Sequence, residues 1–184
     1  MNYQDYIWDL GGTLLDNYGT STAAFVHTLQ DFGLTASHDE VYKALKVSTE
    51  YAVRQFAPRN KEFLKAYKAN EAKELEHPIL FEGASELLAQ IIQQGGRNFL
   101  ISHRDDQVLE ILQKTQISAY FTEVVTATNG FKRKPDPESM LYLKDKYQIQ
   151  SGLVIGDRSI DVEAGQAAGF SCYLFDNIKI LKNL

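Results

Sequence analysis

The sequence predicts an α/β fold with a Rossmann-like parallel sheet, helices on both faces of the sheet, and an inserted helical domain. Short apolar segments alternate with helical segments through most of the chain, which is typical of parallel sheets buried on both faces. One long segment, residues 17–80, lacks the strand pattern altogether. The expected strands lie near residues 5–9, 97–102, 122–127, 152–156 and 171–175.

The inserted segment is predicted to form helices only. Ser37 and Glu40 have the spacing of a capping box, and Ser48 and Asn60 are favourable N-caps. We therefore expect a core of residues 1–16 and 81–184, interrupted by a helical domain of residues 17–80. The expected helices span residues 20–32, 37–46, 48–57 and 60–76.

Composition excludes several classes of partner. Hydrophobic residues make up 44% and charged residues 23% of the 184 residues, as in ordinary globular proteins. The formal net charge of −5 argues against a nucleic-acid partner, which requires a basic surface. The N-terminus lacks a basic region followed by an apolar stretch, and no window has the length of a membrane span. We therefore expect a cytoplasmic protein with no membrane contact.

A carboxylate and two glycines follow the first expected strand. Asp9 ends the segment 6–9, and Gly11 and Gly12 would let backbone N–H groups approach a bound anion closely. The pattern also resembles the first phosphate loop of sugar kinases of the hexokinase and actin type. Those kinases need two ribonuclease-H-like domains, and 184 residues are too few to supply both.

Further polar residues lie where expected strands end or helices begin. In parallel α/β sheets, ligands bind outside the carboxyl ends of the strands. A carboxylate, a hydroxyl, a lysine and an acidic pair follow one another here in the order found in the haloacid dehalogenase superfamily, which the chain resembles over almost its whole length. The residues that carry this resemblance are Asp9, Ser102, Lys134, Asp157 and Asp161.

The resemblance is to the helical-cap subgroup, which includes phosphoglycolate phosphatases and β-phosphoglucomutases. It implies that residues 17–80 form a cap that closes over the substrate. Asp16 and Asn17 would then lie in the first hinge, although both residues suit a helix start equally well.

The resemblance also implies a mechanism. Asp9 would attack the phosphoryl group of a small phosphorylated metabolite and form an aspartyl phosphate. Mg²⁺ would be held by oxygen ligands, which a hard cation prefers. The implied metal site consists of Asp9, the Gly11 carbonyl, Asp157 and Asp161, with Asp161 orienting a metal-bound water or Lys134. The implied phosphate site consists of the Gly12 and Thr13 amides, the Ser102 hydroxyl, Lys134 and His103, with Arg104 beside it.

Gly11 departs from the family pattern. Phosphatases of the superfamily carry a second aspartate two residues after the nucleophile, where it protonates the leaving group and later activates water. Loss of a general acid or base costs about 10²–10⁴ in rate.

Three functions remain open at this stage. The first is a weak or specialised Mg²⁺-dependent phosphatase, and the second is a non-hydrolytic phospho-ligand-binding or scaffold protein. The third is a hydrolase of carbon–phosphorus or carbon–halogen bonds, because such members also lack the second aspartate. Lys46 would be the Schiff-base lysine of a phosphonoacetaldehyde hydrolase. Asp157 counts against a dehalogenase, which dispenses with the metal.

Overall fold

The computed structural model describes residues 3–74 and 76–176. The chain forms two compact units. One unit runs up to Leu15 and resumes at Leu80, and the other spans Asp16–Ile79. These divisions fall one residue before the boundaries expected from the sequence.

The first unit contains a five-stranded parallel sheet with the strand order β3-β2-β1-β4-β5. The central strand β1 pairs with β2 and β4, so that Ile7 lies opposite both Phe99 and Val154. All five strands were predicted from the sequence, and the α/β prediction is confirmed. The strands are β1 (Asp5–Trp8), β2 (Arg97–Ile101), β3 (Phe121–Val125), β4 (Gly152–Gly156) and β5 (Ser171–Leu174).

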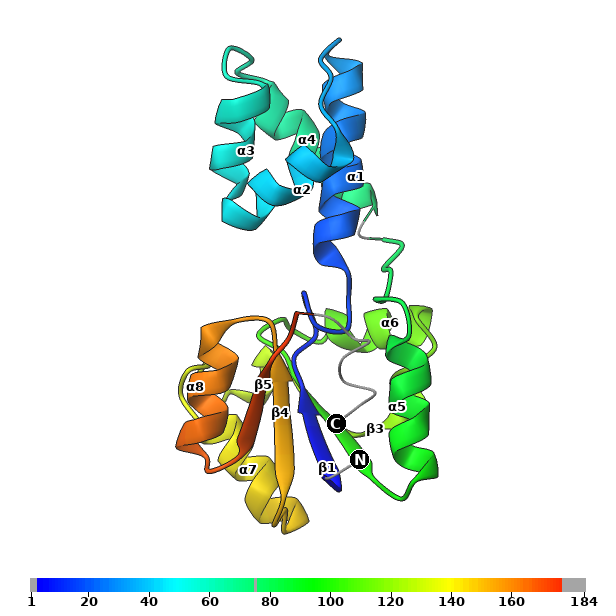
Figure 1. The fold of residues 1–184 in the computed structure, drawn as a ribbon, viewed down its shortest axis with the longest axis vertical. Helices are drawn as coiled ribbons and strands as arrows, with labels where there is room; N and C mark the ends of the chain where they lie inside the picture. The colour runs from blue at the N-terminus through cyan, green and yellow to red at the C-terminus, as the bar shows by residue number, and fades with distance from the viewer. Residues whose placement is uncertain (1–2, 75, 177–184) are drawn as a thin grey trace. The chain divides into compact units, whose positions relative to one another are not determined.

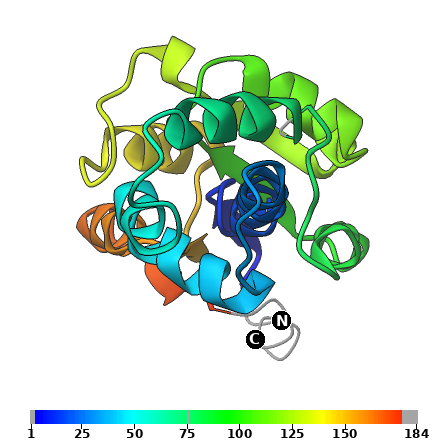
Figure 2. The same ribbon diagram turned by 90° about the horizontal axis from the view of Figure 1, so that it is seen from above.

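Helices cover both faces of this sheet (Figure 1). Successive residues of β1 point to opposite faces: Tyr6 and Trp8 pack in the core under α5 and α6, and Ile7 packs in the core under α7 and α8. Figure 2 shows the same separation of the helices from above. The helices are α5 (Ala84–Gln93), α6 (Gln107–Lys114), α7 (Glu138–Tyr147) and α8 (Ser159–Ala167), with 3₁₀ helices η1 (Ser118–Tyr120) and η2 (Ala127–Asn129) on either side of β3.

The second unit is helical, as its sequence predicts. Its own core is built around Phe25, whose ring contacts the rings of Phe63 and Tyr67, each with centroids 4.9 Å away. Ser37 and Glu40 form the predicted capping box. The helices are α1 (Asn17–Asp31), α2 (His38–Val47), α3 (Thr49–Phe56) and α4 (Phe63–Glu74).

Among the described residues, none of the helices combines the length and the apolar character needed to cross a bilayer.

One fully buried amide links several elements of the sheet unit. Asn98 on β2 is 0% exposed. Its Oδ1 accepts a hydrogen bond from the Trp8 indole at 3.0 Å, and its Nδ2 donates to the carbonyls of Leu88 at 3.1 Å and Tyr120 at 3.2 Å. The amide therefore ties β2 to β1, α5 and η1.

Asn98→Leu should lower the free energy of unfolding by about 2–4 kcal/mol, because it leaves a buried donor and two carbonyls without their partner. Urea denaturation followed by circular dichroism measures the change. Gln113→Leu on the exposed side of α6 is the control and should change stability by less than about 0.5 kcal/mol. Equal effects of the two substitutions would contradict a central role for Asn98.

Candidate active site

The carboxyl ends of three adjacent strands carry the predicted site residues. Asp9 follows β1, Ser102 follows β2, and Asp157 follows β4. The Asp9 amide donates to the Ile155 carbonyl and the Ser102 amide to the Val125 carbonyl, both at 2.9 Å. These bonds continue the ladder past the strand ends, so the backbone fixes where both side chains start.

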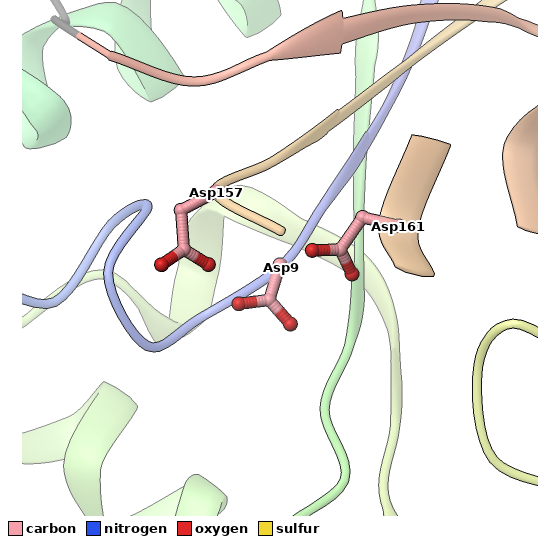
Figure 3. A group of neighbouring side chains, drawn as sticks. All are labelled: Asp9, Asp157 and Asp161. Atoms are coloured by element: carbon pink, nitrogen blue, oxygen red, sulfur yellow. The ribbon is translucent and has the colours of Figure 1, made fainter. Parts of the chain in front are cut away.

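Three carboxylates meet at this edge (Figure 3). Asp9, Asp157 and Asp161 each offer an oxygen, and these oxygens lie within 4.8 Å of one another. Asp161 lies in the first turn of α8, is 2% exposed, and accepts a hydrogen bond from the Arg158 amide at 3.2 Å. The structure thus brings together the acidic residues that the sequence proposed for the metal site.

Two glycines make room for these acids. A Cβ at Gly12 would lie 2.3 Å from Asp157 Oδ2, and a Cβ at Gly156 would lie 2.3 Å from Asp161 Cγ. Any other residue at either position would displace a carboxylate. The Gly-Asp pair at the end of β4 is therefore a packing requirement of the acidic cluster.

Lys134 inserts its ammonium among the acids. Its side chain is 2% exposed, and Nζ lies 2.6 Å from Asp9 Oδ1 and 2.5 Å from Asp161 Oδ1. Nζ also donates to the Ile101 carbonyl at 3.3 Å. Asp9 after β1, Ile101 in β2 and Asp161 in α8 therefore contact one buried cation.

The cluster carries more negative than positive charge. Burial and the charges of Asp9 and Asp161 raise the pKa of Asp157 to about 6. Burial also raises the pKa of Asp9, against the opposing effect of Lys134. Burial alone would lower the pKa of Lys134, but Asp9 and Asp161 raise it above its ordinary value, so the lysine stays charged. One ammonium balances only one of three carboxylates.

The donor set fits a divalent cation. Asp157 Oδ1 is buried and has no hydrogen-bond partner among the described residues. Carboxylate oxygens that lack protein donors and face one another are suitable ligands for a hard cation, which would relieve their repulsion.

The turn after Asp9 uses a backbone amide that the sequence assigned to phosphate binding. The Gly12 amide, expected to bind phosphate, donates instead to the Leu15 carbonyl at 2.9 Å. The cause is a tight turn with Gly12 at φ +82°, which closes the loop on itself. The Thr13 amide makes only a long contact of 3.4 Å to the Leu10 carbonyl, and the Thr13 side chain is fully buried.

Gly11 has an ordinary backbone conformation. Its φ is not among the positive values found at six other glycines. An L-residue can therefore occupy this position without the strain of a left-handed conformation.

Ser102 and His103 lie side by side at the end of β2. The Ser102 hydroxyl oxygen accepts from the Arg104 amide at 3.2 Å, which leaves the hydroxyl proton available for a ligand. His103 Nε2 accepts a hydrogen bond from the Lys134 amide at 2.8 Å. The sequence predicts that His103 binds phosphate, but its Nε2 is already engaged by the Lys134 amide. Sequence reasoning missed this contact.

His103 is a neutral side chain in this setting. Burial, together with the nearby charges of Lys134 and Arg133, lowers its pKa to about 4. Because Nε2 accepts a hydrogen bond, the proton of the neutral imidazole belongs on Nδ1.

Comparisons with known proteins identify the family. A model of the haloacid dehalogenase-like hydrolase family matches residues 6–175. The chain belongs to the haloacid dehalogenase-like hydrolase family. The resemblance indicated by its motifs is confirmed, and the chain is a hydrolase of this family.

Individual relatives of this hydrolase include phosphatases. It is 29% identical over 189 residues to a phosphoglycolate phosphatase from Aliivibrio fischeri, covering 91% of this chain and 81% of that protein. It is 25% identical to the pyrophosphatase PpaX from Oceanobacillus iheyensis, over 91% of this chain and 81% of that protein. The crystal structure of a hydrolase from Streptococcus pneumoniae is 69% identical, covers 100% of this chain and 98% of that one, and superposes with a TM-score of 0.97.

Lys46 belongs to the helical unit. It lies in the last turn of α2, and its ammonium sits over the rings of Tyr18 and Tyr42, 5.6 and 5.2 Å from their centroids. Lys46 thus packs against two aromatic rings of its own unit, a contact that the sequence did not predict.

Proposed function

We propose that this hydrolase is a phosphatase of small phosphorylated metabolites that works through a phosphorylated Asp9. The observation that carries the proposal is the placement of the Asp9 carboxylate 2.6 Å from the Lys134 ammonium and beside Asp157 at the end of the central strand. Similarity to two kinds of phosphatase supports the same conclusion.

A divalent metal, Mg²⁺ by its preference for oxygen, would be held by Asp9, Asp157 and the Gly11 carbonyl, with Asp161 as a further acidic neighbour. When bound, it supplies positive charge that offsets the charge of the carboxylates and of the phosphoryl oxygens. The partnerless Asp157 Oδ1 supports this assignment.

In this proposal the other residues of the site take the following roles. A carboxylate oxygen of Asp9 bonds to phosphorus while the bond from phosphorus to the leaving oxygen breaks. Water then attacks phosphorus, which releases inorganic phosphate and regenerates Asp9. Lys134 offsets the charge of Asp9 and of the phosphoryl group, and the Ser102 hydroxyl donates to a phosphoryl oxygen. Asp161 forms a second ion pair with the ammonium of Lys134 and so helps to hold it beside Asp9.

Gly11 sets the preferred leaving group. Without an aspartate at this position, the leaving oxygen departs with little help from an acid in the nucleophile loop. The absence of an acid matters little for acyl phosphates, phosphoanhydrides and aryl phosphates, because their leaving groups are weak bases. Alkyl phosphates have strongly basic leaving groups and need the proton. We further propose that the helical unit Asp16–Ile79 is a cap that excludes water from the reaction.

The alternative function, binding of a phosphorylated ligand without hydrolysis, also rests on Gly11. If no other group supplies a proton, the intact phosphate site would bind its ligand without turnover. A hydrolysis screen separates the two functions.

The wild-type protein should hydrolyse acyl phosphates, pyrophosphate or aryl phosphates in the presence of Mg²⁺, with release of inorganic phosphate as the readout. Asp9→Asn should abolish turnover, and Asp145→Asn on the exposed side of α7 should not change it. No release from any phosphoester, anhydride or phosphonate would favour the binder, and turnover by Asp9→Asn would exclude Asp9 as the nucleophile.

Mg²⁺ should raise the melting temperature of the wild-type protein, because it binds only the folded acidic cluster. A concentration of 100 times Kd corresponds to about 2.7 kcal/mol of stabilisation. Asp157→Asn should lose most of this response, while Asp145→Asn retains it, as measured by scanning calorimetry with and without Mg²⁺. An unchanged response in Asp157→Asn would place the metal elsewhere.

Gly11→Asp should raise the rate on alkyl phosphates by at least about tenfold, a fraction of what a general acid contributes. Aryl and acyl phosphates should gain much less, because their leaving groups need little protonation. Gly11→Asn has the same shape without the acid and should give no gain. If Gly11→Asp folds and binds Mg²⁺ but gains nothing on alkyl phosphates, the missing aspartate does not explain the substrate preference.

A further inference from the structure

Both the backbone and the side chain of Lys134 bind residues at the end of β2. Its amide donates to His103 Nε2 at 2.8 Å, and its ammonium donates to the Ile101 carbonyl at 3.3 Å. Ser102, the hydroxyl proposed for phosphate binding, lies between these two partners in the chain. The three consecutive residues therefore fix the lysine and the hydroxyl relative to each other.

The loop that carries Lys134 makes backbone contacts on either side of this residue: the Lys132 amide donates to Glu138 Oε2 at 2.8 Å, and the Asp136 amide donates to the Arg133 carbonyl at 3.0 Å. Arg133 and Pro135, the neighbours of Lys134, are exposed, and the loop connects η2 to α7 rather than belonging to either. Ion pairs to Asp9 and Asp161 hold the ammonium, but a long flexible side chain does not fix its own backbone. The imidazole of His103 holds the backbone at Lys134 itself, because it accepts the hydrogen bond of the Lys134 amide.

We propose that His103 is a positioning residue for the phosphatase reaction, which sets Lys134 relative to Asp9 and Ser102 through its Nε2 acceptor. This inference rests on the proposed function, in which Lys134 faces the transferring phosphoryl group. His103 does not contact that group through Nε2. It acts through the lysine.

The surroundings of the imidazole suit this role. The charges that face it are Lys134, Arg133 and Arg158, which disfavour an imidazolium, and Asp161, which opposes them. A neutral ring with a free Nε2 lone pair is the form that accepts from an amide. His103 also borders a pocket of about 230 Å³ together with Phe131 and Ser139.

Matched variants separate the acceptor from the volume of the ring. In His103→Gln the amide oxygen reaches the place of Nε2, and in His103→Leu a side chain of similar size has no acceptor. His103→Leu should lower kcat by at least about tenfold with KM within about threefold, because a small displacement of a catalytic group is costly. His103→Gln should stay within about threefold of wild type in both constants. His103→Ala should follow His103→Leu, which gives a second acceptor-free variant.

Hydrogen exchange of the Lys134 amide, followed by nuclear magnetic resonance, reports on the bond without any turnover. His103→Leu should accelerate this exchange by at least about threefold, the loss expected for one hydrogen bond, and His103→Gln should not. If His103 had only a structural role, its substitution would change the melting temperature, but His103→Gln and His103→Leu would have the same kcat.

Equal kcat values for the Gln and acceptor-free variants, or unchanged exchange at Lys134 in His103→Leu, would overturn the proposal. If the wild type hydrolyses nothing, the proposed function fails on its own. The role of His103 is then decided by the affinity for inorganic phosphate with Mg²⁺, measured by calorimetry. Weaker binding by His103→Leu than by His103→Gln would support positioning, and equal binding would refute it.

Discussion

The insertion of the Lys134 ammonium between Asp9 and Asp161 is the interaction on which the rest of the site depends. The ends of β1 and β4 and the first turn of α8 bring three acidic residues to one edge of the sheet, where burial raises the pKa values of Asp9 and Asp157. The ammonium of Lys134 offsets the charge of the two carboxylates that it contacts, those of Asp9 and Asp161. The negative charge that remains suits the site to a cation, which would in turn offset the charge of a phosphoryl group.

Much of this arrangement follows from local sequence patterns. The strand before Asp9 and the strand before Asp157 are short apolar runs, and a parallel sheet necessarily gathers their carboxyl ends. Asp161, four residues after Asp157 in the sequence, lies in the first turn of the helix that follows β4. Ser37 and Glu40 predict their capping box because both partners lie within one helical turn.

Other contacts depend on how distant segments meet, which local patterns do not contain. His103 and Lys134 are separated by 31 residues, and their bond exists because β2 and the loop before α7 end at the same edge of the sheet. Asn98 sits in an apolar strand with no sign that it pairs with Trp8, 90 residues away. The Gly12 amide was expected to be free, but its use by Leu15 depends on the closure of the turn.

The central claim is that Asp9 becomes phosphorylated during turnover. Acid quenching in the steady state, reduction with borohydride and peptide mass spectrometry test it most directly, because borohydride converts an aspartyl phosphate to homoserine. The account predicts homoserine at position 9, dependent on substrate and on Mg²⁺. Turnover with aspartate intact at position 9 and the modification at another residue would contradict it.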